Sequence, residues 1–409
     1  MSIMERLAVY LPPFASDYSG VCSALYELNC LIIIDDASCC TRNYVTYDEP
    51  RWTESTRSTF GSNLRTIEAV LGDEERLISQ TIEAAEKLKP EFIALLGSPV
   101  PAIIGRDMKG IAREIEARSG FAALGFDTTG FSYYNKGISA AHLQLLQRFA
   151  VPGIPTAAGH VNILGLTPLD FSANDNSRDL IRLLEDNGFR VNVSFWMQTG
   201  LDQVRRAPAA KVNLVVSQSG WAAAQYLYKS YGIPYVAAAP LGIRHSRMVL
   251  EALGQTMADK QNRIIKDAKT GTGAAWLAAG EDGAWPAAGT GALLIIGDQV
   301  MANSLRAALR QADCRQDITV ASFFDLEPEL ALPGDLLLKS EKQLIKLLRS
   351  GAYTRLMADP LILSIPAAAG LKGHSLPHPA ISSLLHWQDV PLFLGEEFEK
   401  LILSWSDGN

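Results

Sequence analysis

The chain has 409 residues, more than one hydrophobic core usually supports, so we expect two or three domains. Its composition, 48% hydrophobic and 20% charged, is typical of a globular protein, and a formal net charge of -7 without a basic tract argues against nucleic acid as the main partner. Apolar stretches are too short for a signal-peptide core or a membrane-spanning helix, so we expect a soluble, cytoplasmic protein.

The first predicted elements are short apolar runs that alternate with amphipathic helical stretches. Turns rich in Gly, Ser, Pro and Asp separate them, and this alternation predicts a parallel α/β sheet. Strands are expected near residues 31–35, 92–96 and 121–126, and helices near 21–30, 62–89, 105–118 and 139–150.

The same alternation is repeated twice more along the chain. The second set has strands within 159–170, 189–195, 211–217 and 233–242, and helices at 177–188, 200–208, 220–232 and 245–275. The third set alternates strand and helix between residues 291 and 370. We therefore predict three Rossmann-like parallel-sheet modules, at residues 1–155, 156–285 and 286–409, with the C-terminal segment packing back on the first module.

Five cysteines, four of them within the first 40 residues, are the sharpest feature of the composition. An odd number in a long chain without an export signal indicates reduced thiols. Cys30 is expected in the core and Cys314 in a surface turn. Cys22, Cys39 and Cys40 are candidate ligands for iron–sulfur or zinc, although their spacing fits neither C-x-x-C nor a zinc finger. The alternative is that they are small buried hydrophobic residues.

Ligands of parallel α/β sheets bind outside the carboxyl ends of the strands. Cys39 and Cys40 follow the first clear strand, and "GSPVP", which contains Ser98, follows the next. The sequence therefore predicts a site at this edge of the first sheet.

Two other motifs are weaker candidates. "TGTGAA" (270–275) has the glycines of a phosphate loop but follows a polar helix instead of a strand, so nucleotide binding is not favoured. Ser217 and Ser219 lie at a strand-to-helix turn, where a helix cap explains them better than a nucleophile does.

Two polar stretches lie outside the regular pattern. His374, His378 and His386 are separated by prolines that exclude regular helical spacing, so a surface loop with one functional histidine is expected. "TYDEPRW" (46–52) is either a binding loop or an intersubunit contact.

The order of "DDASCCTRNY", "LLGSPVPAIIGRDMKGIAREIE", "VNILGLTPLD", "NLVVSQSGWAAAQYLYKSYGIPY" and "LLIIGDQVMANSLRAAL" resembles the nitrogenase component 1 type oxidoreductases. That family includes the molybdenum-iron protein subunits, the cofactor-assembly scaffold and the dark-operative protochlorophyllide reductase. The resemblance covers almost the whole chain in order. It implies paired subunits that receive electrons from a separate P-loop iron protein, with ATP bound only by that partner.

The resemblance also implies an iron–sulfur cluster at the subunit interface, to which each subunit gives about three cysteines. Cys40 matches the second position, and Cys22 lies near the first, for which Ala15 is the alternative by simple counting. Ser98 stands where the third cysteine is expected, and its oxygen is a poorer ligand for cluster iron than thiolate. Cys22 and Cys40 of two subunits would hold one [4Fe-4S] cluster, with Cys39 as a substitute ligand; alternatively, a different partner chain supplies the competent ligands.

What the resemblance implies for function is ATP-dependent reduction of an unknown small substrate by a homodimer or a heterodimer with a second component 1-like chain. Ser217 stands in the region where nitrogenases have a cysteine ligand for their active-site cofactor, so dinitrogen is not the expected substrate. His160, Arg106 or the 46–52 loop is expected to contact the substrate in the crevice among the modules. The alternatives are a non-catalytic scaffold that has lost the cluster and a small-molecule-binding protein of the same fold.

Overall fold

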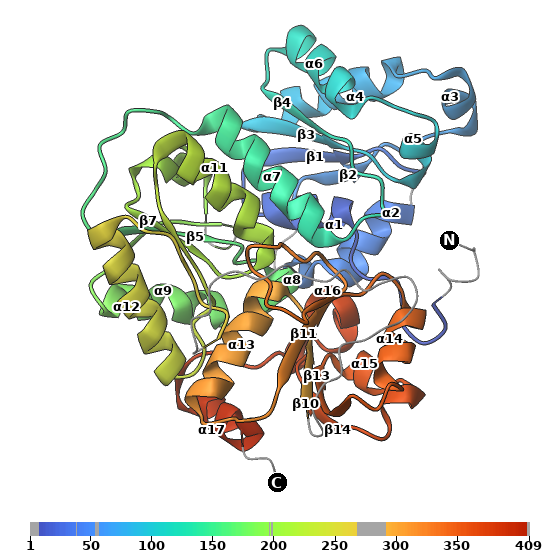
Figure 1. The fold of residues 1–409 in the computed structure, drawn as a ribbon. Helices are drawn as coiled ribbons and strands as arrows, with labels where there is room; N and C mark the ends of the chain where they lie inside the picture. The colour runs from blue at the N-terminus through green and yellow to red at the C-terminus, as the bar shows by residue number, and fades with distance from the viewer. Residues whose placement is uncertain are drawn as a thin grey trace.

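Three parallel β-sheets carry the fold, in the computed structural model that describes residues 8–37, 39–53, 57–195, 197, 199–267 and 292–406. Their strand orders are β2-β1-β3-β4, β6-β5-β7-β8-β9 and β12-β11-β10-β13-β14. Figure 1 shows them as three lobes, the first at the upper right, the second at the left and the third at the bottom. The predicted fold class, three parallel α/β modules, is confirmed.

The first module forms because apolar runs such as Phe92–Leu96 are buried at every position, as expected for strands covered by helices on both faces. Its strands are β1 Cys30–Ile34, β2 Thr59–Gly61, β3 Phe92–Leu96 and β4 Ala123–Phe126. Its α-helices are α1 Asp17–Leu25, α2 Cys39–Asn43, α3 Thr66–Leu71, α4 Glu75–Leu88, α5 Pro99–Ile103, α6 Met108–Ser119 and α7 Tyr134–Phe149.

Two predicted helices of this module differ from the structure. The helix expected at 62–89 is two helices, because Gly72 takes a left-handed conformation (φ 67°) that ends α3. The helix expected at 21–30 starts earlier and ends at Leu25, since Cys30 already begins strand β1.

The second module follows the predicted alternation, except that the helix expected at 245–275 ends at Asp259. Lys260 adopts a left-handed conformation there, and a short strand follows. Its elements are β5 His160–Leu164, α8 Pro168–Phe171, α9 Asn176–Asp186, β6 Arg190–Ser194, α10 Leu201–Arg205, β7 Val212–Val215, α11 Trp221–Tyr231, β8 Tyr235–Ala237, α12 Arg244–Asp259 and β9 Arg263–Ile264. The "TGTGAA" motif at 270–275 lies outside the described residues.

The third module contains the last sheet and the C-terminal helices. Its elements are β10 Ala292–Ile296, α13 Gln299–Gln311, β11 Ile318–Ser322, β12 Leu336–Leu337, α14 Glu341–Leu348, β13 Tyr353–Ala358, α15 Pro360–Leu363, β14 Lys372–Ser375, α16 Pro379–Ser382 and α17 Gly395–Ser406. The segment around α16 contacts the first module, where Ala15 N–H donates to Ala380 O (2.9 Å), whereas α17 packs on α13.

The modules are joined by close helix packing and a shared core. Helix α7 packs on α1 and on α11 of the second module, and lies along the boundary of these lobes in Figure 1. A Cβ on Gly137 would lie 1.8 Å from Asp17 O, so only glycine permits this approach of α7 to α1. One buried hydrophobic cluster includes residues of all three sheets, among them Ile32, Leu164 and Leu294.

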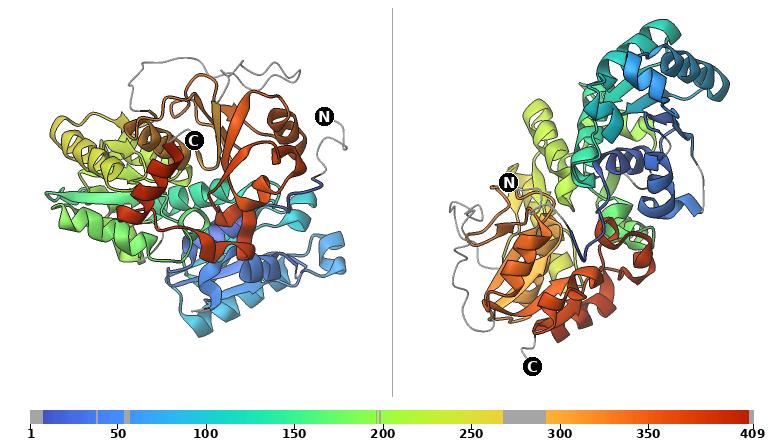
Figure 2. Two further views of the ribbon diagram at one scale, coloured as in Figure 1. Left: turned by 90° about the horizontal axis from the view of Figure 1, so that it is seen from below. Right: turned by 90° about the vertical axis from the view of Figure 1, so that its right-hand side faces the viewer.

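The first and third modules lie at opposite ends of the molecule in the right-hand view of Figure 2, and the N-terminal segment runs between them. Over the ranges given above, helices that combine the length and apolar character needed to cross a membrane are not found.

Candidate functional site

The carboxyl edge of the first sheet brings Cys40, Ser98 and Tyr18 together. Cys39 and Cys40 begin α2 beyond the end of β1; Cys39 is exposed and Cys40 is half-buried. The turn is held by Asp36, whose Oδ2 accepts from the N–H and hydroxyl of Thr41 (2.6 and 2.8 Å). Burial, and then the charge of Asp36, raise the pKa of the Cys40 thiol above its usual value, although the polar side chains of Ser98 and Tyr18 act in the opposite direction.

Ser98, at the position where a third cysteine was expected, is 1% exposed. Its hydroxyl donates to Asp35 O (2.7 Å) and so ties the loop after β3 to the loop after β1. Beside this contact, Asp35 forms an ion pair with Arg106 (2.8 Å), and both side chains are almost fully buried. Ser98 and Arg106 thus fix the backbone that presents Cys40.

Cys22 lies away from this edge, inside the protein. It has no exposed surface, packs in the hydrophobic core, and burial raises the pKa of its thiol well above the usual range, with the nearby Cys30 adding to the shift. A thiol in this environment is inert towards a surface cluster. A ligand role for Cys22 stays a prediction, and its burial argues against it.

The fit of this edge to an iron–sulfur cluster is partial. Over the described part of the chain, no three Cys, His, Asp or Glu side chains are grouped to hold a metal ion. The edge offers two thiols near the surface, Cys39 and Cys40, and a serine hydroxyl already bonded to a carbonyl. Such a donor set fits one half of a site completed by another chain, not a whole [4Fe-4S] site.

The 46–52 loop is largely internal. The Glu49 carboxylate is completely buried and bonds the Arg51 guanidinium (2.6 Å), whose Nη2 also donates to Ser23 O (2.8 Å). These two charges bind the loop to α1, and contact of the loop with a substrate stays a prediction. His160 is the first residue of β5 and so lies at the amino end of the strand, opposite the carboxyl edge where ligands of such sheets bind.

Two further residues differ from expectation and one agrees. Cys30 is in the core as predicted. Cys314 is buried instead of lying on the surface, because its side chain packs in a hydrophobic core cluster, and Arg310 at the end of α13 donates to Cys314 O (2.7 Å). Ser217 precedes its helical turn, but its hydroxyl donates to Gly165 O (2.7 Å) instead of capping that turn.

A buried polar cluster at the junction of the three modules was missed by the sequence analysis. Tyr134 of α7 donates its hydroxyl proton to Asp170 Oδ1, and His378 Nε2 lies 3.6 Å from the same oxygen. Burial, and then the charge of Asp298, raise the pKa of Asp170 to about 8, whereas burial lowers that of His378 to about 3. At neutral pH the cluster therefore pairs a protonated carboxyl group with a neutral imidazole. Such a pair can store a proton, or it can join the three modules through uncharged hydrogen bonds.

His378 is the member of the histidine group that occupies a distinctive site. His386 pairs with Asp389 on the surface (2.6 Å), and His374 Nε2 lies 2.9 Å from Arg355 Nη2. Helpful signals in the sequence were the aspartate of "LTPLD", just after a strand, and a histidine flanked by prolines. Neither signal identifies the partner residue.

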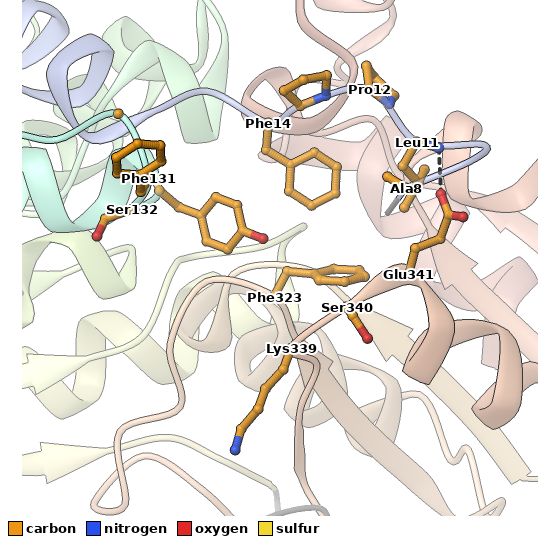
Figure 3. A pocket seen from close by; sticks show the side chains of 13 residues that line it. Ala8, Leu11, Pro12, Phe14, Phe131, Ser132, Phe323, Lys339, Ser340 and Glu341 are labelled. Carbon is orange, nitrogen blue, oxygen red and sulfur yellow. Dashed lines mark hydrogen bonds between the residues drawn. The ribbon is translucent and has the colours of Figure 1, made fainter. Parts of the chain in front are cut away.

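Two cavities lie on either side of the N-terminal segment Pro12–Phe14. Figure 3 shows the larger, of about 650 Å³, with Phe14, Phe131 and Phe323 around it and Lys339 below. Glu341 at its side accepts the N–H groups of Val9, Tyr10 and Leu11 at 2.8–2.9 Å. The second cavity, about 460 Å³, reaches Tyr18 and therefore the neighbourhood of Cys40.

Comparison with known proteins agrees with this architecture. One subunit of the light-independent protochlorophyllide reductase of Prosthecochloris aestuarii is 28% identical over 182 residues, which cover 44% of this chain and 34% of that protein. The corresponding protein of Chlorobium phaeobacteroides is 34% identical over 131 residues, which cover 32% and 24%. These matches span about a third or less of the length of the relatives.

A solved structure of nitrogenase Cp1 at pH 5 superposes with a TM-score of 0.63, covering 98% of this chain and 88% of that one at 14% identity. This likeness shows the fold. The sequence model of nitrogenase component 1 type oxidoreductases matches residues 29–344, which is most of the chain. The resemblance noted in the sequence is thus confirmed, and the chain belongs to the nitrogenase component 1 type oxidoreductase family.

Proposed function

We propose that the chain is a subunit of a nitrogenase-like oxidoreductase that receives electrons from an ATP-hydrolysing iron protein through an interface iron–sulfur cluster and reduces a small substrate other than dinitrogen. The observation that supports this most directly is the half-exposed Cys40 thiol at the carboxyl edge of the first sheet. Membership of the family supports the oxidoreductase class.

In this proposal Cys40 is the principal ligand of the chain, and the exposed Cys39 is a second one. A bound [4Fe-4S] cluster would supply storage and transfer of single electrons at low potential. Asp36 and Ser98 hold the loop that presents the thiols, and a second copy or a related chain completes the ligand set.

Apolar side chains beside this edge support a partner there. Helix α5, which follows Ser98 directly, leaves Val100 and Ile103 exposed by 41% and 74%, and Ile104, which ends the helix, is exposed by 39%. Apolar side chains gathered on one short helix are typical of a surface covered by another chain.

A scaffold that kept the fold and lost the cluster is the second candidate. The buried Cys22 and the serine at position 98 support it, because both remove ligands that the family supplies. We nevertheless favour low-potential reduction, because that proposal gives a role to the accessible thiols of Cys39 and Cys40 at the sheet edge.

The test is anaerobic purification of the protein from its own cells through a tag on this chain, so that partner chains remain attached. We expect a brown complex with bound iron and the broad visible absorption of a cluster. Cys40→Ala should lose the iron, whereas Cys314→Ala, a buried thiol of the third module, should keep it. A colourless, iron-free complex after anaerobic reconstitution, unchanged in Cys40→Ala, would favour the scaffold.

A further inference from the structure

The smaller cavity has an apolar mouth and a polar inner end. Tyr47, Leu384 and Leu385 line its mouth and are exposed by 47%, 49% and 66%. The polar end includes Tyr18 and Asp48. Its volume of about 460 Å³ lies within the roughly 300–1,000 Å³ range of small-molecule sites.

Asp48 is the unusual member of this lining, because it is 5% exposed and has only neutral partners. Its Oδ2 accepts from the Ser19 hydroxyl (2.6 Å) and from the Asn43 amide (3.1 Å). Among the described residues, ion pairs within 4.0 Å involve other carboxylates but not this one, and no cationic group contributes to the shift of its pKa.

Burial raises the pKa of Asp48 to about 6, so the carboxyl is mainly ionised at pH 7.5. The other titratable groups that face it are Tyr18 and Cys22 on α1 and the adjacent Glu49, whose charge is already paired with Arg51. A buried carboxylate without a cation in a largely apolar cavity is costly, and the missing counter-charge is the natural contribution of a ligand.

We propose that this cavity binds an apolar molecule bearing a protonated amine, with the Asp48 carboxylate as its counter-ion and the wall of Tyr47, Leu384 and Leu385 around its apolar body. The inference deepens the proposed function, and it rests on that function only where the bound molecule is taken to be the substrate. Binding itself requires no iron. Tyr18 lines this cavity, and its side chain also interacts with the Cys40 thiol, so the ligand would lie next to the proposed redox centre.

The test compares, by calorimetry on the iron-free protein at pH 7.5, three probes that share a phenyl ring and a four-carbon chain: 4-phenylbutylamine, 4-phenylbutanol and 4-phenylbutyrate. We expect the amine to bind at least about tenfold more tightly than the alcohol and the carboxylate to bind weakest. The ionised Asp48 attracts the ammonium group of the amine and repels the carboxylate of the butyrate. Lowering the pH to about 5 should weaken the amine and leave the alcohol unchanged, since Asp48 then takes up a proton.

Asp48→Asn should remove the preference for the amine over the alcohol, whereas Asp127→Asn, an exposed aspartate paired with Lys109 on the surface, should keep it. Leu385→Ala, at the exposed mouth, should weaken amine and alcohol by the same factor and keeps the test valid if Asp48→Asn does not fold. Equal binding of amine and alcohol, or an amine preference that survives in Asp48→Asn, would overturn the proposal. Loss of iron in Cys40→Ala tests the cluster alone and leaves probe binding unaffected.

Discussion

Replacing Arg106 by methionine removes the cation from the ion pair that underlies the Cys40 loop. The guanidinium lies 2.8 Å from Asp35 Oδ2, and the two side chains are 3% and 0% exposed. After the change the Asp35 carboxylate stays buried, with the Ser62 hydroxyl (2.6 Å) as its remaining side-chain partner. Breaking a buried pair by removal of one member costs about 3–5 kcal/mol, which lowers the folding equilibrium constant by roughly two to three and a half powers of ten.

Equilibrium urea unfolding followed by circular dichroism measures this loss. The double variant Arg106→Met with Asp35→Asn should recover at least about 1.5 kcal/mol relative to the single variant, because no unpaired charge is left inside. Lys87→Met is the matched control, since it removes an exposed partner of Glu83 and should change stability little. A loss below about 1 kcal/mol for Arg106→Met, or no recovery in the double variant, would show that the pair is effectively solvated and refute the reasoning.

Two other predictions concern the buried acid at the junction of the modules and the packing of α7 on α1 within the first module. Asp170 keeps its proton up to about pH 8 in the folded protein, because its pKa is raised there, whereas the unfolded chain releases this proton near pH 4. Raising the pH between these values should therefore lower the free energy of unfolding of the wild type relative to Asp170→Asn. Parallel pH profiles of the two proteins in unfolding experiments would contradict the raised pKa. Gly137→Ala should lower stability by about 1–3 kcal/mol, because its Cβ meets Asp17 O, whereas Gly254→Ala, in open space on α12, should raise it by about 0.5–1 kcal/mol. Melting temperatures that move in the same direction in both glycine variants would contradict the packing argument.

The sequence predicted the sheets and the meeting of Cys40 with Ser98 for the same physical reason. Short apolar runs such as Phe92–Leu96, bounded by turns, favour buried strands, and parallel strands bring their carboxyl ends to one edge. Two loops separated by more than 50 residues could therefore be placed side by side without coordinates.

The position of Cys22 could not be predicted in this way. Every residue of α1 is buried, its polar residues Asp17, Ser19 and Ser23 included, so the polar positions in its sequence do not mark a solvent-facing side from which the inward direction of the thiol could be told. The pairing of Tyr134 with Asp170 and His378 was equally hidden, because the first and last of these residues are 244 positions apart and meet only through packing of whole modules. The sequence placed Asp48 in a polar loop, but it could not show that Asp48 lacks a cation. That depends on the structure, in which Arg51 pairs with the neighbouring Glu49 instead.

The contact between Glu341 and the backbone of Val9, Tyr10 and Leu11 spans 330–332 residues of sequence. At about 5–20 residues per second, a ribosome needs roughly 20–60 s to travel from one side of this contact to the other. The N-terminal segment beside the two cavities is thus synthesised well before Glu341, and it can take its final place only after that interval.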